Sequence, residues 1–255
     1  MNPPIIREIA KLIDHALLHP TLTDAELREG CELALKYDVA SVCIKPYAIR
    51  MATELLAGSD VLVGTVIGFP HGSNSTSIKV AETEQACQDG AVEIDMVVNI
   101  GKVLSQDWEY VADEISVVHK TCQVHGAILK VIFETDFLTN DAHKIKLCEI
   151  CTEVGAEFVK TSTGFGFVKG SNRSYDYQGA TSHDLQIMLN HVGPSVHVKA
   201  SGGIRTLDEL LTAKELGATR IGTSSTAAII EAAYRRFGVV PADSQAIPIP
   251  DANGY

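Results

Sequence analysis

Two lysines stand near the carboxyl ends of apolar, strand-like runs and are the first candidates for chemistry. Lys160 lies in the run 157–161 and is followed by a Ser/Thr/Gly loop, and Lys199 lies in a run that ends at the turn Gly202-Gly203. A lysine inside an apolar strand is costly unless a charge partners it or it serves a reaction. Because the two stretches share one construction, we expect both lysines in one site.

A pair of close lysines suits imine chemistry. A second cation and partial loss of water both lower the pKa of a lysine, and the neutral amine can attack a carbonyl carbon to form an imine. The protonated imine withdraws electrons, so an adjacent C–C or C–H bond can break when an acid or base is in place. Asp95 is the best candidate for that group, and the chemistry requires no metal or other cofactor.

An alternation of strands and helices positions these residues. It indicates a parallel sheet with right-handed crossovers, and eight units in 255 residues predict a single (β/α)8 TIM barrel of the α/β class. An open doubly wound sheet is the alternative, but no G-x-G-x-x-G follows the first strand. The predicted strands span 12–17, 39–44, 61–69, 92–98, 127–133, 157–161, the residues around Lys199, and 219–222; the predicted helices span 23–37, 47–57, 77–88, 107–125, 141–153, 182–191, a segment opened by the capping box 206–209, and 225–236.

Side chains alternate along a strand, and the apolar neighbours of the charged residues belong against the helices. Asp95, Lys130, Lys160 and Lys199 therefore point into the barrel, and Glu93 joins them by the same parity. The plain alternative to catalysis is a buried ion-pair network. We expect that role for Lys130, which lies deeper in its strand and can neutralise Glu93. For Lys160 and Lys199 we expect function, since catalytic groups stand at the carboxyl ends of barrel strands.

The loops after the late strands are rich in glycine, serine and threonine. In barrels a phosphate is often held by the loops after the seventh and eighth strands, at a helix N-terminus, and Arg205 can add positive charge. Helix capping and tight turns would explain the same residues, so both interpretations stay open here. The expected phosphate-binding residues are Thr163, Gly164, Gly202, Gly203, Ser224 and Ser225.

A series of motifs runs in order through nearly the whole chain. They are LIDHALL (12–18), VCIKP (42–46), GFPHG (68–72), EIDMVVNIG (93–101), LKVIFET (129–135), VKTSTGF (159–165), VKASGGIRT (198–206) and RIGTSS (220–225). Together they resemble the deoxyribose-phosphate aldolase family. The resemblance implies a class I, Schiff-base aldolase on a TIM barrel, which cleaves 2-deoxy-D-ribose 5-phosphate to D-glyceraldehyde 3-phosphate and acetaldehyde.

The resemblance also implies roles for individual residues. On the family pattern Lys160 forms the imine, Lys199 tunes it and moves protons, and Asp95 donates and accepts protons. The TSTG, GGIR and GTSS loops bind the phosphate. Asp14 in LIDHALL and Cys43 in VCIKP join the expected substrate-binding residues.

The carboxyl-terminal segment 239–255 is rich in proline and polar residues. We therefore expect residues 1–238 to form the barrel and 239–255 to be a flexible tail. Members of the family can carry a tyrosine at a mobile carboxyl terminus that reaches the site as a proton carrier. Tyr255 stands at that position, and by sequence alone it is equally the end of a loose tail.

Two features depart from the family pattern. The loop 166–180 is longer than the short loop expected after the imine strand, and it borders the site. Some relatives carry a basic residue directly after TSTG, where this chain has Phe165. Lys169 or Arg173 in the longer loop can substitute for that charge, or the pocket for the acceptor aldehyde is altered.

Composition limits the partners. A net charge of −11 argues against nucleic acid and anionic membranes, no apolar run approaches a bilayer span, and the amino terminus lacks the features of a signal peptide. Cys148 and Cys151 form a C-x-x-C inside a helical pattern without a second pair, which favours packing over a metal or redox site. We expect a cytoplasmic protein with free thiols that acts on a small sugar phosphate and aldehyde, as a homodimer or higher homo-oligomer.

Two other functions fit the same scaffold. One is a related imine-forming aldolase with an altered or unphosphorylated aldehyde acceptor. The other is a non-catalytic barrel that binds sugar phosphates, and the intact set of Asp95, Lys160 and Lys199 argues against it.

Overall fold

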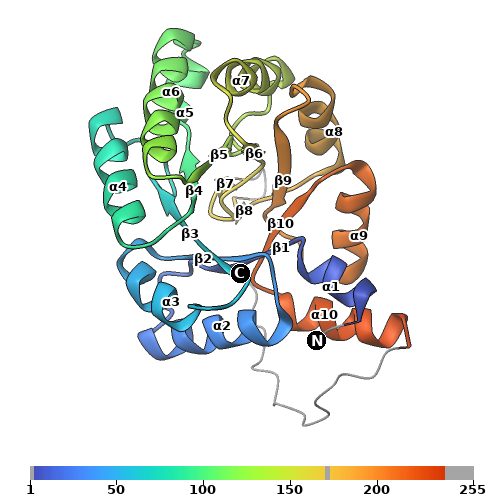
Figure 1. The fold of residues 1–255 in the computed structure, drawn as a ribbon. Coiled ribbons are helices and arrows are strands. Elements are labelled where there is room, and N and C mark those ends of the chain that lie inside the picture. Colours follow the sequence, from blue (N-terminus) through green and yellow to red (C-terminus); the bar gives the residue numbers. More distant parts are fainter. Residues whose placement is uncertain (1–2, 170–172, 239–255) are drawn as a thin grey trace.

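The computed structural model describes residues 3–169 and 173–238; the predicted tail 239–255, with Tyr255, lies outside them. Eight parallel strands close into a barrel, and helices surround it (Figure 1). The prediction of a (β/α)8 TIM barrel is therefore confirmed. The barrel strands are β1 (Ile13–Leu17), β2 (Ser41–Ile44), β3 (Leu62–Ile67), β4 (Glu93–Val97), β5 (Ile128–Ile132), β6 (Phe158–Lys160), β9 (His197–Ser201) and β10 (Arg220–Thr223), and β1 pairs with both β2 and β10 to close the ring.

The helices begin where the sequence places capping residues. Thr23 and Thr206 each form a capping box with the glutamate three residues on, so both starts fall where the pattern predicts them. None of the helices in the described ranges is long and apolar enough to cross a membrane. The helices are α1 (Pro4–Ala10), α2 (Asp24–Tyr37), α3 (Ile49–Leu55), α4 (Thr76–Gln88), α5 (Ile100–Leu104), α6 (Trp108–Val124), α7 (Asp141–Val154), α8 (Ser182–His191), α9 (Leu207–Leu216) and α10 (Thr226–Arg236).

Three helical predictions differ from the structure. The predicted helix 47–57 begins as a 3₁₀ turn, Pro46–Ala48, and is α-helical only in α3. The helices α1 and α5 were not predicted from the sequence. Each has at most seven residues, which is too short for a helical period to stand out in an apolar pattern.

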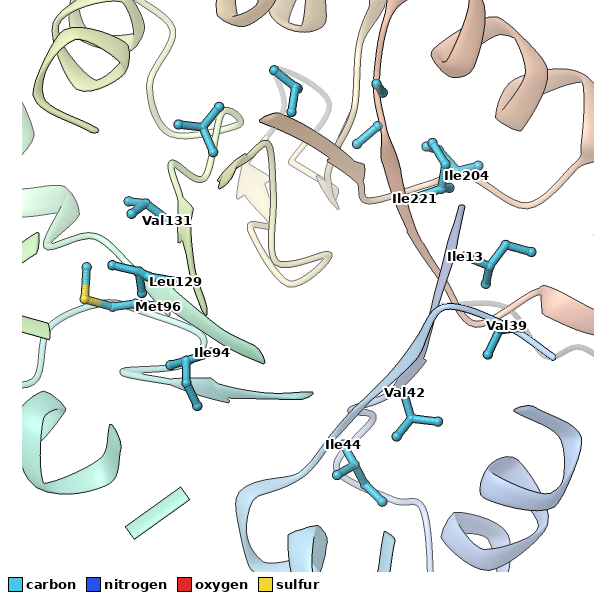
Figure 2. Close-up of a cluster of buried hydrophobic side chains, with 14 of the residues drawn as sticks. Ile13, Val39, Val42, Ile44, Ile94, Met96, Leu129, Val131, Ile204 and Ile221 are labelled. Carbon is cyan, nitrogen blue, oxygen red and sulfur yellow. The ribbon is translucent and has the colours of Figure 1, made fainter. Parts of the chain in front are cut away.

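Apolar side chains on the outside of the barrel form the core between strands and helices. Ile94 and Met96 of β4 and Leu129 and Val131 of β5 are fully buried in this layer (Figure 2). They flank Asp95 and Lys130 in the chain, and side chains alternate between the two faces of a strand. The predicted inward direction of the charged residues is confirmed by their mutual contacts, described below.

The predicted loop 166–180 contains a β-hairpin. Its strands β7 (Val168–Lys169) and β8 (Tyr175–Asp176) pair antiparallel, and the hairpin lies over the centre of the barrel in the view of Figure 1. The base of the hairpin is anchored at Gly179, whose N–H donates to Asp136 Oδ2 over 3.0 Å and whose carbonyl accepts from the Thr135 hydroxyl over 3.3 Å. The segment that the sequence analysis treated as a long loop therefore contains two short paired strands, and its base contacts the residues that follow β5.

Gly179 has a positive φ of 69° and packs against the loop after β9. A Cβ at this position would lie 2.3 Å from the Gly202 carbonyl oxygen. Gly126, the matched control, has a φ of 70° but open space around it. We expect Gly126→Ala to lower the free energy of unfolding by about 1–2 kcal/mol, the cost of a left-handed residue with a side chain.

Gly179→Ala should cost clearly more than Gly126→Ala, because the backbone around Gly202 must also move. Urea unfolding of both variants measures the difference. Equal losses would contradict the close packing of the hairpin base.

Candidate active site

A chain of buried ion pairs fills the barrel below its carboxyl-terminal mouth. Lys160 and Lys199 are register partners on β6 and β9, and their Nζ atoms contact the same oxygen, Asp95 Oδ2, at 2.8 and 2.5 Å. Lys199 also donates to Asp14 Oδ2. The structure thus brings together the two lysines and the carboxylate that the sequence singled out, and it adds Asp14 as a direct partner of Lys199.

The network continues toward the other end of the barrel. Lys130 contacts Asp95 Oδ1 and Glu93 Oε2, both at 2.8 Å, which confirms its predicted pairing with Glu93. Arg220 donates to both oxygens of Glu93, at 2.8 and 3.1 Å. Arg220 was missed by the sequence analysis, although its position on the last strand next to Lys199 made it available as a fourth cation.

The surroundings of these groups fix most of their charges. Burial raises the pKa of Asp95, but the charges of Lys130, Lys160 and Lys199 outweigh burial and hold that pKa well below its usual value. Burial lowers the pKa of Lys199, yet Asp14 and Asp95 outweigh it and raise the pKa above the ordinary value. The pKa of Lys130 is raised against burial by Asp95 and Glu93. Lys199 and Lys130 therefore stay protonated at neutral pH.

The charges of the network do not balance when every lysine is protonated. Three carboxylates, those of Asp14, Glu93 and Asp95, face four cations. Loss of one proton from a lysine brings the buried network to neutrality, which a low-dielectric interior favours. Lys160 contacts one carboxylate of the network, Asp95, whereas Lys130 and Lys199 each contact two.

A pocket opens above the network. Asp14, Cys43, Lys160 and Lys199 lie at its deep end, each at most 3% exposed. Asp14 Oδ1 is buried, and among the described residues no group hydrogen-bonds it. A substrate hydroxyl or a water in the pocket can therefore donate to it. Burial raises the pKa of Cys43 to about 12, so this cysteine is a neutral thiol.

Most of the predicted binding residues line the same pocket. Asp95 is covered by the lysines and does not line it, and Ser225 lies just beyond, with its N–H donating to the Thr223 hydroxyl. Lys169 and Arg173, the basic residues considered as substitutes at Phe165, do not line the pocket, whereas Tyr177 of the same segment does. The predicted residues that line the pocket are Asp14, Cys43, Lys160, Thr163, Gly164, Lys199, Gly202, Gly203 and Ser224; His19, Phe165, Tyr177, Ser201 and Arg205 line it with them.

The acidic groups at the deep end could be taken for a metal site. The ligand atoms of Asp14, Cys43 and Asp95 lie within 4.8 Å of one another. However, the Lys199 ammonium group binds both carboxylates, so a cation from the chain itself already occupies the cluster.

Comparison with known proteins places this chain in a family. The sequence model described as DeoC/LacD family aldolase matches residues 8–232. The chain belongs to the DeoC/LacD family of aldolases. It is 49% identical over 232 residues to a deoxyribose-phosphate aldolase of Rhodopirellula baltica, covering 91% of this chain and 92% of the relative. The identity with the enzyme of that name from Thermococcus kodakarensis is 45%, covering 89% and 97% of the two chains.

A solved structure gives the same result. The deoxyribose phosphate aldolase of Aeropyrum pernix superposes with a TM-score of 0.79 at 30% identity, over 89% of this chain and 91% of its own. That protein is described as a tetramer. The aldolase fold therefore extends over the whole barrel that carries the lysines, from β1 to β10.

The aldolase pocket has a buried carboxyl group beside it that the sequence analysis did not select. Glu134 follows β5 with a positive φ of 59°. Its Oε1 accepts from the Thr163 N–H over 3.2 Å, and its Oε2 is hydrogen-bonded to the Thr163 hydroxyl. The Thr163 hydroxyl is thus engaged by Glu134, and this contact holds the loop that contains Thr163 in place. Only the position of Glu134 at a strand end, in the motif LKVIFET, could have indicated it.

The pKa of Glu134 predicts a pH dependence of stability. Burial raises this pKa from 4.5 to about 7, although hydrogen bonds from Thr163 oppose the shift. The folded protein then keeps a proton that the unfolded chain has lost. Stability should therefore be full below about pH 4.5 and decrease as the pH rises to about 7, by about 3 kcal/mol in all, since one pKa unit corresponds to about 1.4 kcal/mol.

Glu134→Gln is the matched control for this effect. The glutamine amide can donate to Thr163 as a protonated carboxyl group does, and it does not titrate. Urea unfolding at several pH values should show the variant gaining stability relative to wild type between pH 5 and pH 8, because only wild type loses free energy of unfolding over this range. A constant difference would show that Glu134 does not titrate in this range.

Proposed function

We propose that the protein is a class I deoxyribose-phosphate aldolase, which reversibly cleaves 2-deoxy-D-ribose 5-phosphate to D-glyceraldehyde 3-phosphate and acetaldehyde. The observation that carries the proposal is Lys160, a buried lysine that reaches the deep end of the pocket and shares Asp95 Oδ2 with Lys199. The names of the relatives support the substrate. The class I mechanism implied by the resemblance needs a lysine amine at the reacting carbonyl, and Lys160 is placed to supply one.

In the proposed reaction the neutral amine of Lys160 attacks the aldehyde carbon of the open-chain sugar phosphate. One amine proton, a second proton supplied by an acid and the carbonyl oxygen leave as water, and the nitrogen keeps its other proton, so a protonated imine remains. Its positive nitrogen is the electron sink for the next step.

Cleavage breaks the bond between carbons 2 and 3 of the sugar. A base removes the proton from the 3-hydroxyl group, the carbonyl of glyceraldehyde 3-phosphate forms, and the bonding electrons move into the imine to give an enamine. The enamine carbon then takes up a proton, and water releases acetaldehyde and regenerates the Lys160 amine. Asp14 Oδ1, which lines the pocket, is placed to accept a hydrogen bond from a substrate hydroxyl.

The proton path runs through the buried network. Asp95 Oδ2 touches the Nζ atoms of both lysines, so a proton can pass between them through one oxygen atom. Lys199 lines the pocket and Asp95 does not. We therefore assign the exchange of protons with the substrate to Lys199, and the transfer between the lysines to Asp95. Tyr255 as a further proton carrier stays a prediction.

The remaining predictions concern the setting of the enzyme. No cofactor enters the proposed reaction, since the imine itself accepts the electrons. A homo-oligomer is supported by the tetrameric relative from Aeropyrum pernix. Residues 1–238 as one domain with a flexible tail, a homodimer as the smallest assembly, and a cytoplasmic location stay predictions.

Two measurements test the proposed function. A retro-aldol assay would follow glyceraldehyde 3-phosphate from 2-deoxyribose 5-phosphate with an NADH-dependent enzyme. Borohydride reduction in the presence of acetaldehyde, followed by peptide mass mapping, should place the adduct on Lys160. Absence of turnover with an adduct elsewhere in the chain would refute the assignment.

The pocket wall favours one variation of this function. Phe165 and Tyr177 line the pocket, where some relatives have a basic residue after the TSTG motif. A related aldolase with a different or unphosphorylated acceptor aldehyde is therefore the second candidate. A panel of acceptor aldehydes with and without phosphate, assayed in the direction of synthesis with acetaldehyde as donor, distinguishes the two.

A further inference from the structure

The β7–β8 hairpin places one residue in the pocket at a defined position. Tyr177 follows β8 directly and lines the pocket, whereas Tyr175, two residues earlier, is 65% exposed and does not. The ring of Phe167 packs edge-on against Tyr177, with ring centroids 5.3 Å apart. The ring of Phe167, on the opposite arm of the hairpin, thus holds the Tyr177 phenol against the pocket.

The chain just after Tyr177 is tied to the barrel. Asp136 Oδ1 accepts from the Gln178 N–H over 2.5 Å, and the Ala180 N–H donates to the Gly202 carbonyl over 3.0 Å. The second contact joins the hairpin base to the Gly202-Gly203 loop, which lines the pocket. Tyr177 is therefore positioned by the same loop that the sequence analysis predicts to bind phosphate.

The charges in the pocket leave one cation for an anionic ligand. Lys160 and Lys199 are each paired with buried carboxylates. Arg205 is the third cation that lines the pocket, and in residues 3–169 and 173–238 it forms no ion pair with a carboxylate. Its Nη2 donates to the Tyr177 phenol oxygen over 3.4 Å, so the guanidinium and the phenol stand side by side.

We propose that Tyr177 is a specificity-determining residue of the aldolase, whose phenol binds the phosphate group of the substrate together with Arg205. The inference rests on the proposed function for the identity of the sugar phosphate. A phenol that accepts from a guanidinium can donate its own proton to a phosphate oxygen, and hydrogen bonds to charged groups are the stronger class. Lys160, which forms the imine, is level with Lys199 of β9, and Arg205 lies beyond the end of that strand. The phosphate would therefore sit nearer the mouth of the barrel than the imine.

The matched variants are Tyr177→Phe and Tyr175→Phe, which remove the same atom from neighbouring positions. Tyr177→Phe should lower kcat/KM for 2-deoxyribose 5-phosphate about tenfold, chiefly through KM, the effect of losing one hydrogen bond to a charged group. Its kcat/KM for unphosphorylated 2-deoxyribose should stay within about twofold of wild type. Tyr175→Phe should leave both values unchanged.

A binding measurement that needs no turnover separates this inference from the proposed function. Inorganic phosphate, titrated by calorimetry into the full-length protein, should bind Tyr177→Phe about tenfold more weakly than Tyr175→Phe. If wild type cleaves neither sugar and this difference remains, the proposed function fails and the phosphate site stands. Equal phosphate binding by both variants, or an equal loss of kcat/KM on both sugars, would overturn the role of Tyr177.

Discussion

Lys160→Met should abolish turnover of 2-deoxyribose 5-phosphate while leaving the barrel folded. Removal of a covalent nucleophile lowers kcat by up to about 10⁶-fold in a well-studied hydrolase, and a loss of that order is expected here because no imine can form. The fold should survive, since Asp95 keeps the ammonium groups of Lys130 and Lys199 as partners. The variant also brings the network to three cations and three carboxylates.

Lys130→Met is the matched control for this prediction. It also removes one buried ammonium group from Asp95, but Lys130 does not line the pocket. Borohydride trapping with acetaldehyde should give an adduct on Lys160 in wild type and in Lys130→Met, and none in Lys160→Met. An adduct on Lys199 in Lys160→Met, formed at the wild-type rate, would show that the nucleophile has been assigned wrongly.

The sequence was sufficient to predict the barrel and its buried charges. Short apolar runs and helical segments alternate eight times, and parity alone sends Asp95, Lys130, Lys160 and Lys199 inward. That parity argument works because the neighbours of each charged residue pack against the helices, so the charged side chain must point to the opposite face, into the barrel. Because Lys160 and Lys199 both lie near the carboxyl ends of their strands, their side chains are expected in one pocket.

Contacts between distant segments could not be predicted in this way. Asp14 comes from the first strand and Lys199 from the seventh barrel strand, and only closure of the ring makes them partners. The raised pKa of Glu134 depends on how deeply the Thr163 loop covers it. Likewise, the segment 166–180 has a loop-like composition, and the contacts of Asp136 and Gly202 order its base.

Asp95→Asn should have the largest effect on stability. Asp95 is fully buried and, within residues 3–169 and 173–238, is the one carboxylate that touches three ammonium groups. The variant leaves two carboxylates for four cations in the network. Removing one partner of a buried ion pair costs about 3–5 kcal/mol, because the remaining charges are uncompensated. Urea unfolding should show this loss, while Asp60→Asn, at an exposed surface pair, should show none that is measurable.

The pH dependence of the Asp95→Asn variant distinguishes charge repulsion from simple misfit. Repulsion lowers the pKa of the buried lysines in the folded state below that in the unfolded chain. The folded variant then binds fewer protons, so its stability relative to wild type should rise as the pH increases toward the lysine range. A loss that does not change with pH would indicate a packing defect instead.

The double variant Asp95→Asn, Lys130→Met separates the structural role of Asp95 from its catalytic one. Removing one surplus ammonium group should restore part of the lost free energy of unfolding, because two carboxylates then face three cations. Turnover should stay about 10²- to 10⁴-fold below wild type, the contribution typical of a positioned acid or base. The asparagine amide cannot take up and release a proton between Lys160 and Lys199 as a carboxylate can. Recovery of turnover together with stability would mean that Asp95 serves only to hold the lysines in place.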